Sequence, residues 1–173
     1  MFGKFSQLHV HYRRSSLSRK YRSHWWQSRG GIRAGDRAPD VAFTDLRSGS
    51  ETTLFQLMGA LRPVVLFNGL ADSHHWCERL QMVDIDAYAV TMTPSTQADP
   101  AKLLFDRTGD FARLYGLRSA FLSLIRPDGH VGLVQMPPNL DQLLNYLSLI
   151  CNPIQLQRAF PDLMADRSTV DGR

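Results

Sequence analysis

The fold of this chain is decided by the stretch Pro63-Val64-Val65-Leu66-Phe67-Asn68-Gly69-Leu70-Ala71-Asp72-Ser73-His74-His75-Trp76-Cys77. Residues 64–67 form a short apolar run between a proline and the turn pair Asn68-Gly69. A run of this length, rich in β-branched residues and bounded by turn residues, predicts a central strand buried on both faces. The polar loop after it leads to Ser73, a residue type that caps helices, and then to a helix with one apolar face.

Similar patterns on either side of this stretch predict the remaining elements. Strands are expected at 41–43, 51–53, 87–91, 103–105, 121–125 and 131–134. Helical segments are expected at 54–58, 111–115 with Gly116 after it, 140–150 with Asn139 as its cap, and 154–160. Buried strands that alternate with helices, followed by a hairpin and a closing helix, predict an α/β fold whose mixed central sheet is flanked by helices.

The composition limits the class of protein. The chain has 173 residues, of which 43% are hydrophobic and 21% charged, as is usual for one globular domain. No apolar run approaches the roughly 18 residues of a membrane span, and no secretion signal opens the chain. The two cysteines, Cys77 and Cys151, stand far apart, which predicts neither a disulfide framework nor a zinc site. We therefore expect a cytoplasmic protein without a membrane anchor.

The charge is unevenly distributed along the chain. Residues 1–34 hold eight of the 20 Lys and Arg residues and no acid, whereas the rest holds twelve bases against 16 acids. Such a basic arm, with tyrosines and tryptophans between its charges, could bind nucleic acid or act as a mitochondrial transit peptide. We favour a plain basic connector at 1–34, a domain at 35–150 and a C-terminal tail at 151–173, and we expect no nucleic-acid binding.

Two families resemble this sequence. The segment from Tyr115-Gly116 to the turn Arg126-Pro127-Asp128-Gly129 looks like the second half of a thioredoxin fold, with an Asp-Gly hairpin after a strand. The opening Gly35-Asp36-Arg37-Ala38-Pro39-Asp40, with Leu54 and Phe55 after a turn, resembles the peroxiredoxins. It equally resembles the C-terminal domain of FAD-dependent aromatic hydroxylases of the phenol and polyketide hydroxylase type. Both resemblances imply a thioredoxin-like fold.

Peroxiredoxin chemistry needs side chains that this sequence lacks. A peroxidatic cysteine stands in Pro-x-x-x-Thr-x-x-Cys with an arginine on a nearby strand, which together stabilise the thiolate and hold the peroxide. Cys77 is at the right distance from the central strand, but Leu70 and His74 take the Pro and Thr positions, and Ala120 takes the Arg position. A Cys-x-x-Cys pair is also absent, as is a proline near Phe121. We therefore expect no catalytic residue in this chain.

The resemblance to the hydroxylase domain is the broader of the two and covers roughly residues 10–150. Its most specific element is Arg126-Pro127-Asp128-Gly129-His130-Val131. Weaker similarities lie at Trp76, Val83-Asp84, Tyr88, Asp106 with Gly109, and the segment Tyr12-Arg13-Arg14-Ser15-Ser16-Leu17. The resemblance implies a redox-inactive C-terminal module of a monooxygenase, an oxidoreductase, with a structural or interface role.

The same resemblance places the cofactor elsewhere. The chain has no Gly-x-Gly-x-x-Gly after a strand and no room for the large part of such enzymes that holds FAD. We expect no cofactor in this chain, FAD in a parent or partner flavoprotein, and a flavin-binding domain, a partner subunit or a second copy as binding partner.

An alternative function rests on the loop itself. Cys77 could serve as a one-Cys thiol peroxidase or redox sensor, because we expect it in the first turn of a helix beside His74 and His75, whose protonated forms would favour the thiolate. A metal site at Asp72, His74 and His75 would lack a distant fourth ligand, so we expect no metal.

Overall fold

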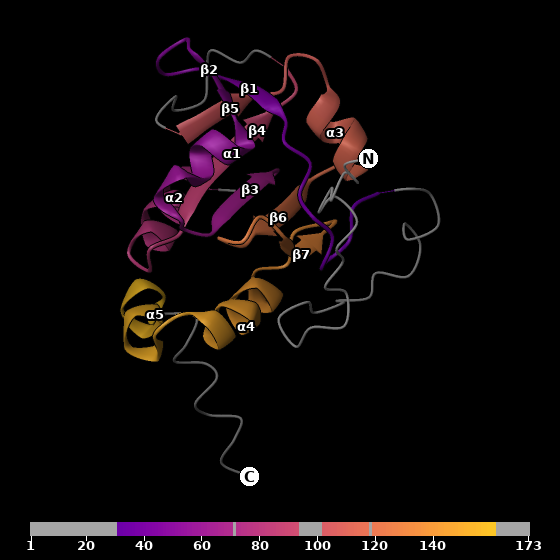
Figure 1. Cartoon of the computed structure of the whole chain (residues 1–173). Helices are drawn as coiled ribbons and strands as arrows, with labels where there is room; N and C mark the ends of the chain where they lie inside the picture. Colours follow the sequence, from indigo (N-terminus) through magenta and orange to yellow (C-terminus); the bar gives the residue numbers. More distant parts are fainter. Residues whose placement is uncertain (1–30, 71, 94–101, 118, 162–173) are drawn as a thin grey trace, which may run out of the picture.

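The computed structural model describes residues 31–70, 72–93, 102–117 and 119–161 (Figure 1). Most of the connector expected at 1–34 lies outside these residues, as do the hydroxylase-like segment at 12–17 and the aromatic residues of the arm. The expectations about nucleic acid and transit function therefore stay predictions.

The described residues form one mixed sheet of seven strands in the order β2-β1-β5-β4-β3-β6-β7. The strands are β1 (Ala42–Asp45), β2 (Glu51–Thr53), β3 (Val64–Asn68), β4 (Asp86–Thr91), β5 (Leu103–Phe105), β6 (Phe121–Ile125) and β7 (Val131–Gln135). Neighbours β3, β4 and β5 run parallel, whereas β6 pairs with β3 and β7 antiparallel. Val64, Val65 and Leu66 in β3 are fully buried, so the predicted central strand is confirmed.

The helical elements are α1 (Leu54–Leu57), the short 3-10 helix η2 (Met58–Ala60), α2 (Ser73–Gln81), α3 (Asp110–Tyr115), α4 (Leu140–Ile150) and α5 (Pro153–Ala159). As predicted, the Asn139 side chain caps α4 by accepting from the backbone N–H of Gln142, and Gly116 ends α3 with φ 69°. The predicted Ser73 cap is wrong. Ser73 is already the first residue of α2, and the residue before it, Asp72, has a left-handed backbone with no side-chain capping bond. None of the helices in the described residues has the length and apolar character to cross a membrane.

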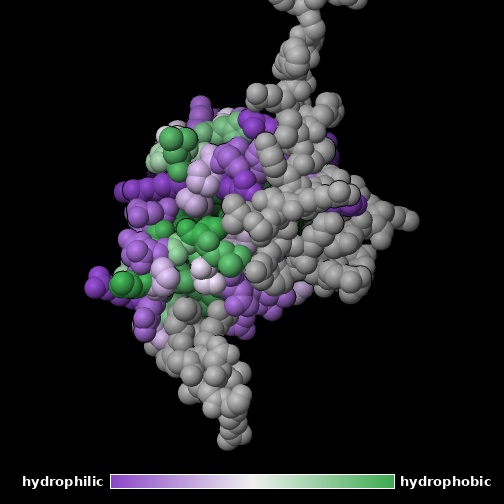
Figure 2. All heavy atoms as spheres, turned by 60° about the horizontal axis from the view of Figure 1, so that its bottom comes forward, coloured by the Kyte–Doolittle hydropathy of each residue, from purple (hydrophilic) through white to green (hydrophobic). Residues whose placement is uncertain are grey.

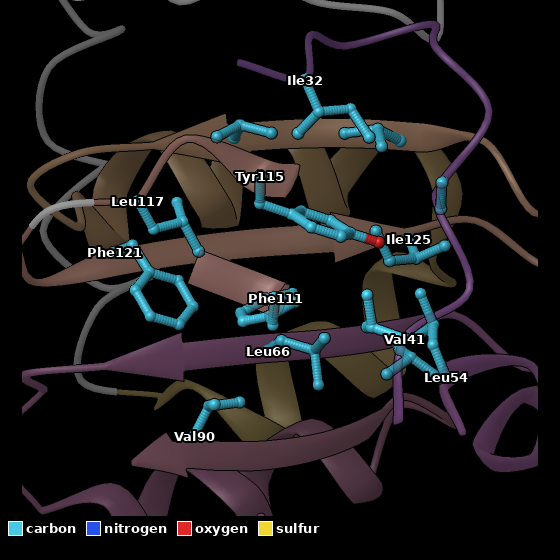
Figure 3. Packing of buried hydrophobic residues seen from close by; sticks show 14 of the residues in the cluster. Ile32, Val41, Leu54, Leu66, Val90, Phe111, Tyr115, Leu117, Phe121 and Ile125 are labelled. Atoms are coloured by element: carbon cyan, nitrogen blue, oxygen red, sulfur yellow. The ribbon is translucent and has the colours of Figure 1, made fainter. Parts of the chain in front are cut away.

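Two hydrophobic layers cover the two faces of the sheet. One layer holds α1, α3 and the segment around Ile32, and Figure 3 shows Phe111, Tyr115 and Phe121 packed together in it. The ring of Phe111 lies 4.4 Å from that of Tyr115 and 5.4 Å from that of Phe121, between centroids. The other layer holds α2, α4 and α5. The predicted α/β architecture, a mixed sheet flanked by helices, is confirmed.

The described part of the expected tail packs against the body. Leu156 and Phe160 at α5 are fully buried, and the Phe160 ring lies 5.4 Å from that of Trp76 in α2. The division at residues 35 and 150 stays a prediction about domain organisation. Figure 2, which brings the lower end of Figure 1 forward, shows apolar surface in green between polar surface in purple. The exposed large apolar residues of α4 and α5 are Leu149, Ile150 and Ile154.

Candidate functional site

Cys77 lies in the second turn of α2 and is only 5% exposed. The first-turn position expected from the sequence is wrong, because the helix begins at Ser73. The electrostatic effect of a helix N-terminus falls off within the first turn, so the thiol gains little from it. Cys77 belongs to the same apolar cluster as Trp76 and Leu80. No disulfide joins Cys77 to Cys151.

A cavity of about 220 Å³ opens beside Cys77. Its walls come from α2, from the turn between β1 and β2, and from the residue ahead of β5; the charged and titratable ones are Arg47, His74, Cys77, Glu78 and Lys102. His74 Nδ1 lies 3.7 Å from the Glu78 carboxylate, one helical turn further along α2. The structure thus brings together Cys77 and His74, the two residues of the alternative function.

The elements expected around a peroxidatic cysteine are replaced by apolar contacts. A Cβ placed on Gly69, in the loop after β3, would lie 2.5 Å from the Cβ of Ala120, so the two residues are in close contact. Ala120 stands where an arginine would be required, and its methyl group supplies neither charge nor hydrogen bond. Leu70 packs against the apolar cluster of Cys77. The cis peptide bond among the described residues is at Met136-Pro137, after β7 and ahead of α4. It is distant from Phe121 in the sequence, although the pairing of Leu122 with Gln135 brings the end of β7 beside the start of β6.

Other polar groups do not form a second chemical centre. Asp84 lies between α2 and β4, Asp86 is the first residue of β4, and Asp106 follows β5. Within the described ranges, no group of three or more His, Cys, Asp or Glu side chains is placed to hold a metal ion. One oxygen of the buried Asp106 side chain accepts from the backbone N–H of Ala112 at 3.0 Å, which ties the loop ahead of α3 to that helix.

A denser set of polar contacts lies at the turn of the β6–β7 hairpin, where residues 35–40 contact residues 126–131. We call these two segments the paired motifs. Three backbone hydrogen bonds join them: Gly35 N to Val131 O at 2.7 Å, Val131 N to Asp36 O at 2.9 Å, and Ala38 N to Gly129 O at 2.9 Å. Within the second segment, Gly129 N donates to Arg126 O at 2.9 Å, which confirms the predicted turn of the β6–β7 hairpin.

Side chains reinforce the paired motifs. Arg126 forms an ion pair with Asp128, and the backbone N–H of His130 donates to the same carboxylate at 3.1 Å. Burial disfavours the charged carboxylate, but these hydrogen bonds and the neighbouring charges outweigh it and lower the pKa of Asp128. The Arg37 guanidinium lies 5.4 Å from the centre of the Phe55 ring.

The start of α1 is tied to the first of the paired motifs. Asp40 Oδ1 accepts from the backbone N–H of Phe55 at 3.0 Å, and the neighbouring Leu54 N donates to Val41 O at 2.9 Å. Residues 35–40, Leu54-Phe55 and residues 126–131, which carry the resemblance to the hydroxylase domain, are therefore in contact with one another. Sequence reasoning missed this meeting, because each piece is explained locally by its own turn residues.

Comparisons with known proteins identify the fold. Neither a family model nor a curated protein matches the sequence. Among solved structures, the 2-Cys peroxiredoxin of Plasmodium vivax is 17% identical, with a TM-score of 0.51 over 67% of this chain and 94% of that one. This chain has a thioredoxin-like fold.

The similar structures include two flavin enzymes. The flavin-dependent monooxygenase PieE, solved with FAD and substrate, is 18% identical, with a TM-score of 0.47 over 76% of this chain and 20% of that one. Aklavinone-11 hydroxylase, solved with FAD and aklavinone, is 23% identical, with a TM-score of 0.49 over 73% of this chain and 21% of that one. The thioredoxin-like chain therefore spans about a fifth of the length of these two enzymes.

Proposed function

We propose that this chain is a redox-inactive thioredoxin-like module of an FAD-dependent aromatic hydroxylase. Its role is structural: it packs against the flavin-binding domain or against a partner subunit. The observation that carries the proposal is the joining of residues 35–40 to residues 126–131 by three backbone hydrogen bonds. These are the segments on which the resemblance to the hydroxylase domain depends.

The paired motifs support this role because they explain the resemblance physically. Turn residues in either segment alone are common in many folds. Here Gly129, with φ 77°, turns the hairpin so that its backbone meets Ala38, and the Arg126–Asp128 ion pair fixes the turn. The resemblance to the hydroxylase domain covers both segments. Their contact makes them one structural unit and not two unrelated turns.

The cofactor and partner follow from the same proposal. FAD is held by the flavin-binding partner, and this chain packs against the surface of that partner. Apolar side chains at the α4–α5 end, Leu149, Ile150 and Ile154, are exposed and would be covered by such packing. Two thiols without a disulfide between them suit a cytoplasmic complex.

A second candidate is a one-Cys thiol peroxidase or redox sensor that uses Cys77 with His74. The cavity beside Cys77, which also contacts His74, favours it. The 5% exposure of Cys77 weighs against it, because a peroxide needs access to the thiol. Ala120 supplies no guanidinium at the position that the peroxiredoxins use, and the cations at the cavity, Arg47 and Lys102, come from other elements.

Hydrogen peroxide separates the two candidates. The full chain is mixed with peroxide, and the mass of the peptide that holds Cys77 is followed over time. The structural role predicts no faster oxidation of Cys77 than of Cys151, which serves as the internal control. Rapid sulfenic acid formation at Cys77 that Cys77→Ser abolishes would contradict the structural role.

Co-expression tests the partner directly. The chain is produced together with a flavoprotein hydroxylase encoded next to it, and the complex is followed by gel filtration with absorbance at the flavin band. We expect this chain to elute with the flavin. Ile154→Asp, at the exposed α4–α5 end, should weaken that association more than Met92→Asp, an exposed apolar residue just after β4. Separate elution with unchanged hydroxylation in the absence of this chain would refute the proposal.

A further inference from the structure

We propose that the cavity beside Cys77 binds a small organic carboxylate, whose charged end is held by Arg47 and Lys102 and whose apolar end lies over Ala89 and Cys77. This site is independent of the proposed structural role, because the paired motifs do not contribute to its walls.

Two cations at the cavity have no ion-pair partner among the residues that the structure describes. The backbone of Arg47 donates to Asp45, but among the described residues no carboxylate lies within ion-pair distance of its guanidinium. Lys102 Nζ donates to Gln81 Oε1 at 2.9 Å, which is a neutral amide oxygen, and no carboxylate of the described residues forms an ion pair with it. Both side chains line the cavity.

Three other arginines of the described body have carboxylate partners. Arg62 pairs with Asp84 at 3.4 Å, and Arg107 pairs with Glu51 at 3.3 Å. Arg113 pairs with Asp110 at 2.5 Å. Arg47 and Lys102 line one cavity without such partners among the described residues. They form a donor set that a bound carboxylate would complete with charge-assisted hydrogen bonds.

The negative charge at the cavity does not cancel this set. Glu78 is the acidic residue among the described lining residues, and His74 Nδ1 lies 3.7 Å from its carboxylate. Counting Arg47, Lys102 and Glu78, the lining has a formal charge of +1 when His74 is neutral and more when it is protonated. A cation is therefore disfavoured as a ligand, and an anion is favoured.

The volume of the cavity and its apolar lining residues restrict the class of ligand further. Its volume of about 220 Å³ lies below the roughly 300 Å³ at which pockets for drug-sized ligands begin, which favours a ligand smaller than a nucleotide or a peptide. The methyl group of Ala89 in β4 and the thiol of Cys77 in α2 give it an apolar side. An acid with a compact apolar body, such as an aromatic or branched carboxylate, matches both features.

Benzoate is the probe that tests the site, and benzamide is its neutral control of nearly the same shape. Each is titrated into the full chain with Cys151→Ser, and binding is followed by calorimetry and by the rate at which a thiol reagent labels Cys77. We expect saturable benzoate binding that slows labelling of Cys77, with benzamide at least about tenfold weaker because it loses the charge-assisted bonds.

Variants assign the binding to the two cations. Arg47→Gln and Lys102→Gln should each weaken benzoate about fivefold or more, and added salt should weaken it further, whereas Arg62→Gln should leave it within about twofold. Circular dichroism confirms that each variant is folded. The proposal would be overturned if benzoate showed no saturable binding, or if benzamide bound as tightly as benzoate. It would also be overturned if inorganic phosphate protected Cys77 from labelling as well as benzoate does, or if the double variant Arg47→Gln, Lys102→Gln bound benzoate as tightly as the unchanged chain.

Discussion

Two regions attached to the same sheet differ in how firmly they are held. The first is the loop after β3 together with α2, and the second is the paired motifs of residues 35–40 and 126–131. The helix α2 begins after a left-handed Asp72 without a side-chain cap, and its His74–Glu78 pair is more than half exposed. The paired motifs are joined by three backbone hydrogen bonds and fixed by an ion pair. The region where thioredoxin-like proteins place redox cysteines is thus the less constrained one here.

This difference indicates where the stability of the chain resides. Hydrogen bonds that fix a turn between buried strands limit the conformations of both strands, whereas an uncapped helix start limits only its own first turn. Substitutions next to the hairpin should therefore cost more than substitutions at exposed positions of α2 and η2. Four predictions test this comparison.

The largest difference is expected for Leu124→Ala in β6 against Met82→Ala at the end of α2. Leu124 is fully buried, so its truncation should lower the free energy of unfolding by about 2–5 kcal/mol through lost burial and a cavity. Met82 is 57% exposed, and its truncation should stay within about 0.5 kcal/mol. Urea unfolding followed by fluorescence measures both, and equal losses would contradict the comparison.

A glycine pair gives the next largest effect. A Cβ on Gly132 in β7 would lie 2.3 Å from the hydroxyl oxygen of Tyr146, a fully buried side chain. Gly132→Ala should therefore lower the free energy of unfolding by about 1–3 kcal/mol through overpacking. In η2, Gly59 has no neighbour within 4 Å of such a Cβ, so Gly59→Ala should be neutral or stabilising by up to about 1 kcal/mol. Urea unfolding measures the stability of both variants. If Gly132→Ala did not lower the free energy of unfolding, the Tyr146 side chain would have to move aside at little cost.

Most of the fold was predictable from the sequence because its signals are local. The apolar run of β3, the turn at Arg126-Pro127-Asp128-Gly129 and the Asn139 cap each act within a few residues, and the structure confirms all three. The expected Ser73 cap failed for a related reason. A serine one residue late in the turn becomes the first helical residue, and the sequence does not reveal which of two adjacent polar residues the helix begins with.

The candidate sites were less predictable because they depend on distant contacts. The proximity of Cys77 and His74 follows from helical spacing and was expected. Arg47 and Lys102 come to the same cavity from the β1–β2 turn and from the residue ahead of β5, and no local pattern links them to α2. The paired motifs likewise needed the sheet order, which places β7 at one edge and leaves its hairpin free to meet residues 35–40.

Alkaline pH should expose the link between α3 and the first of the paired motifs. The hydroxyl of Tyr115 donates to Pro39 O at 3.1 Å, and burial, with a smaller contribution from the charge of Asp40, raises the pKa of Tyr115. A raised pKa in the folded state means that stability is fully present below the unfolded value of about 10 and is lost as the pH rises above it.

The test compares Tyr115→Phe with the unchanged chain in urea. At pH 8 the variant should lose about 1 kcal/mol, the usual value of one hydrogen bond. Between about pH 9.5 and 11 the unchanged chain should lose stability more steeply than the variant, because Tyr115 then ionises only on unfolding. The pKa values of Tyr88 and Tyr146 are also raised by burial, so some decline should remain in the variant. Parallel pH profiles would show that Tyr115 is not held neutral.

The smallest effect is expected for a matched pair of acids, Asp128→Asn in the hairpin and Glu78→Gln in α2. The lowered pKa of Asp128 means that its stabilising contribution is present above the unfolded value of about 4 and is lost as the pH falls through the lower folded value. The side chain is 45% exposed, so solvent screening limits the loss at pH 7 to about 0.5 kcal/mol. Glu78 and His74 are 63% and 55% exposed, and Glu78→Gln should change nothing measurable.

The pH dependence of the Asp128→Asn effect separates the charge of this side chain from its shape. The amide oxygen that the substitution introduces can still accept from the His130 backbone, so what Asp128→Asn removes is mainly the charge that Arg126 faces. Its effect on the urea midpoint should therefore shrink as the pH falls below the unfolded value of about 4, and vanish once the pH lies below the lowered pKa of Asp128 in the folded chain. An effect that does not shrink as the pH falls would instead mean that the geometry of the turn, and not the ion pair, distinguishes the hairpin from α2.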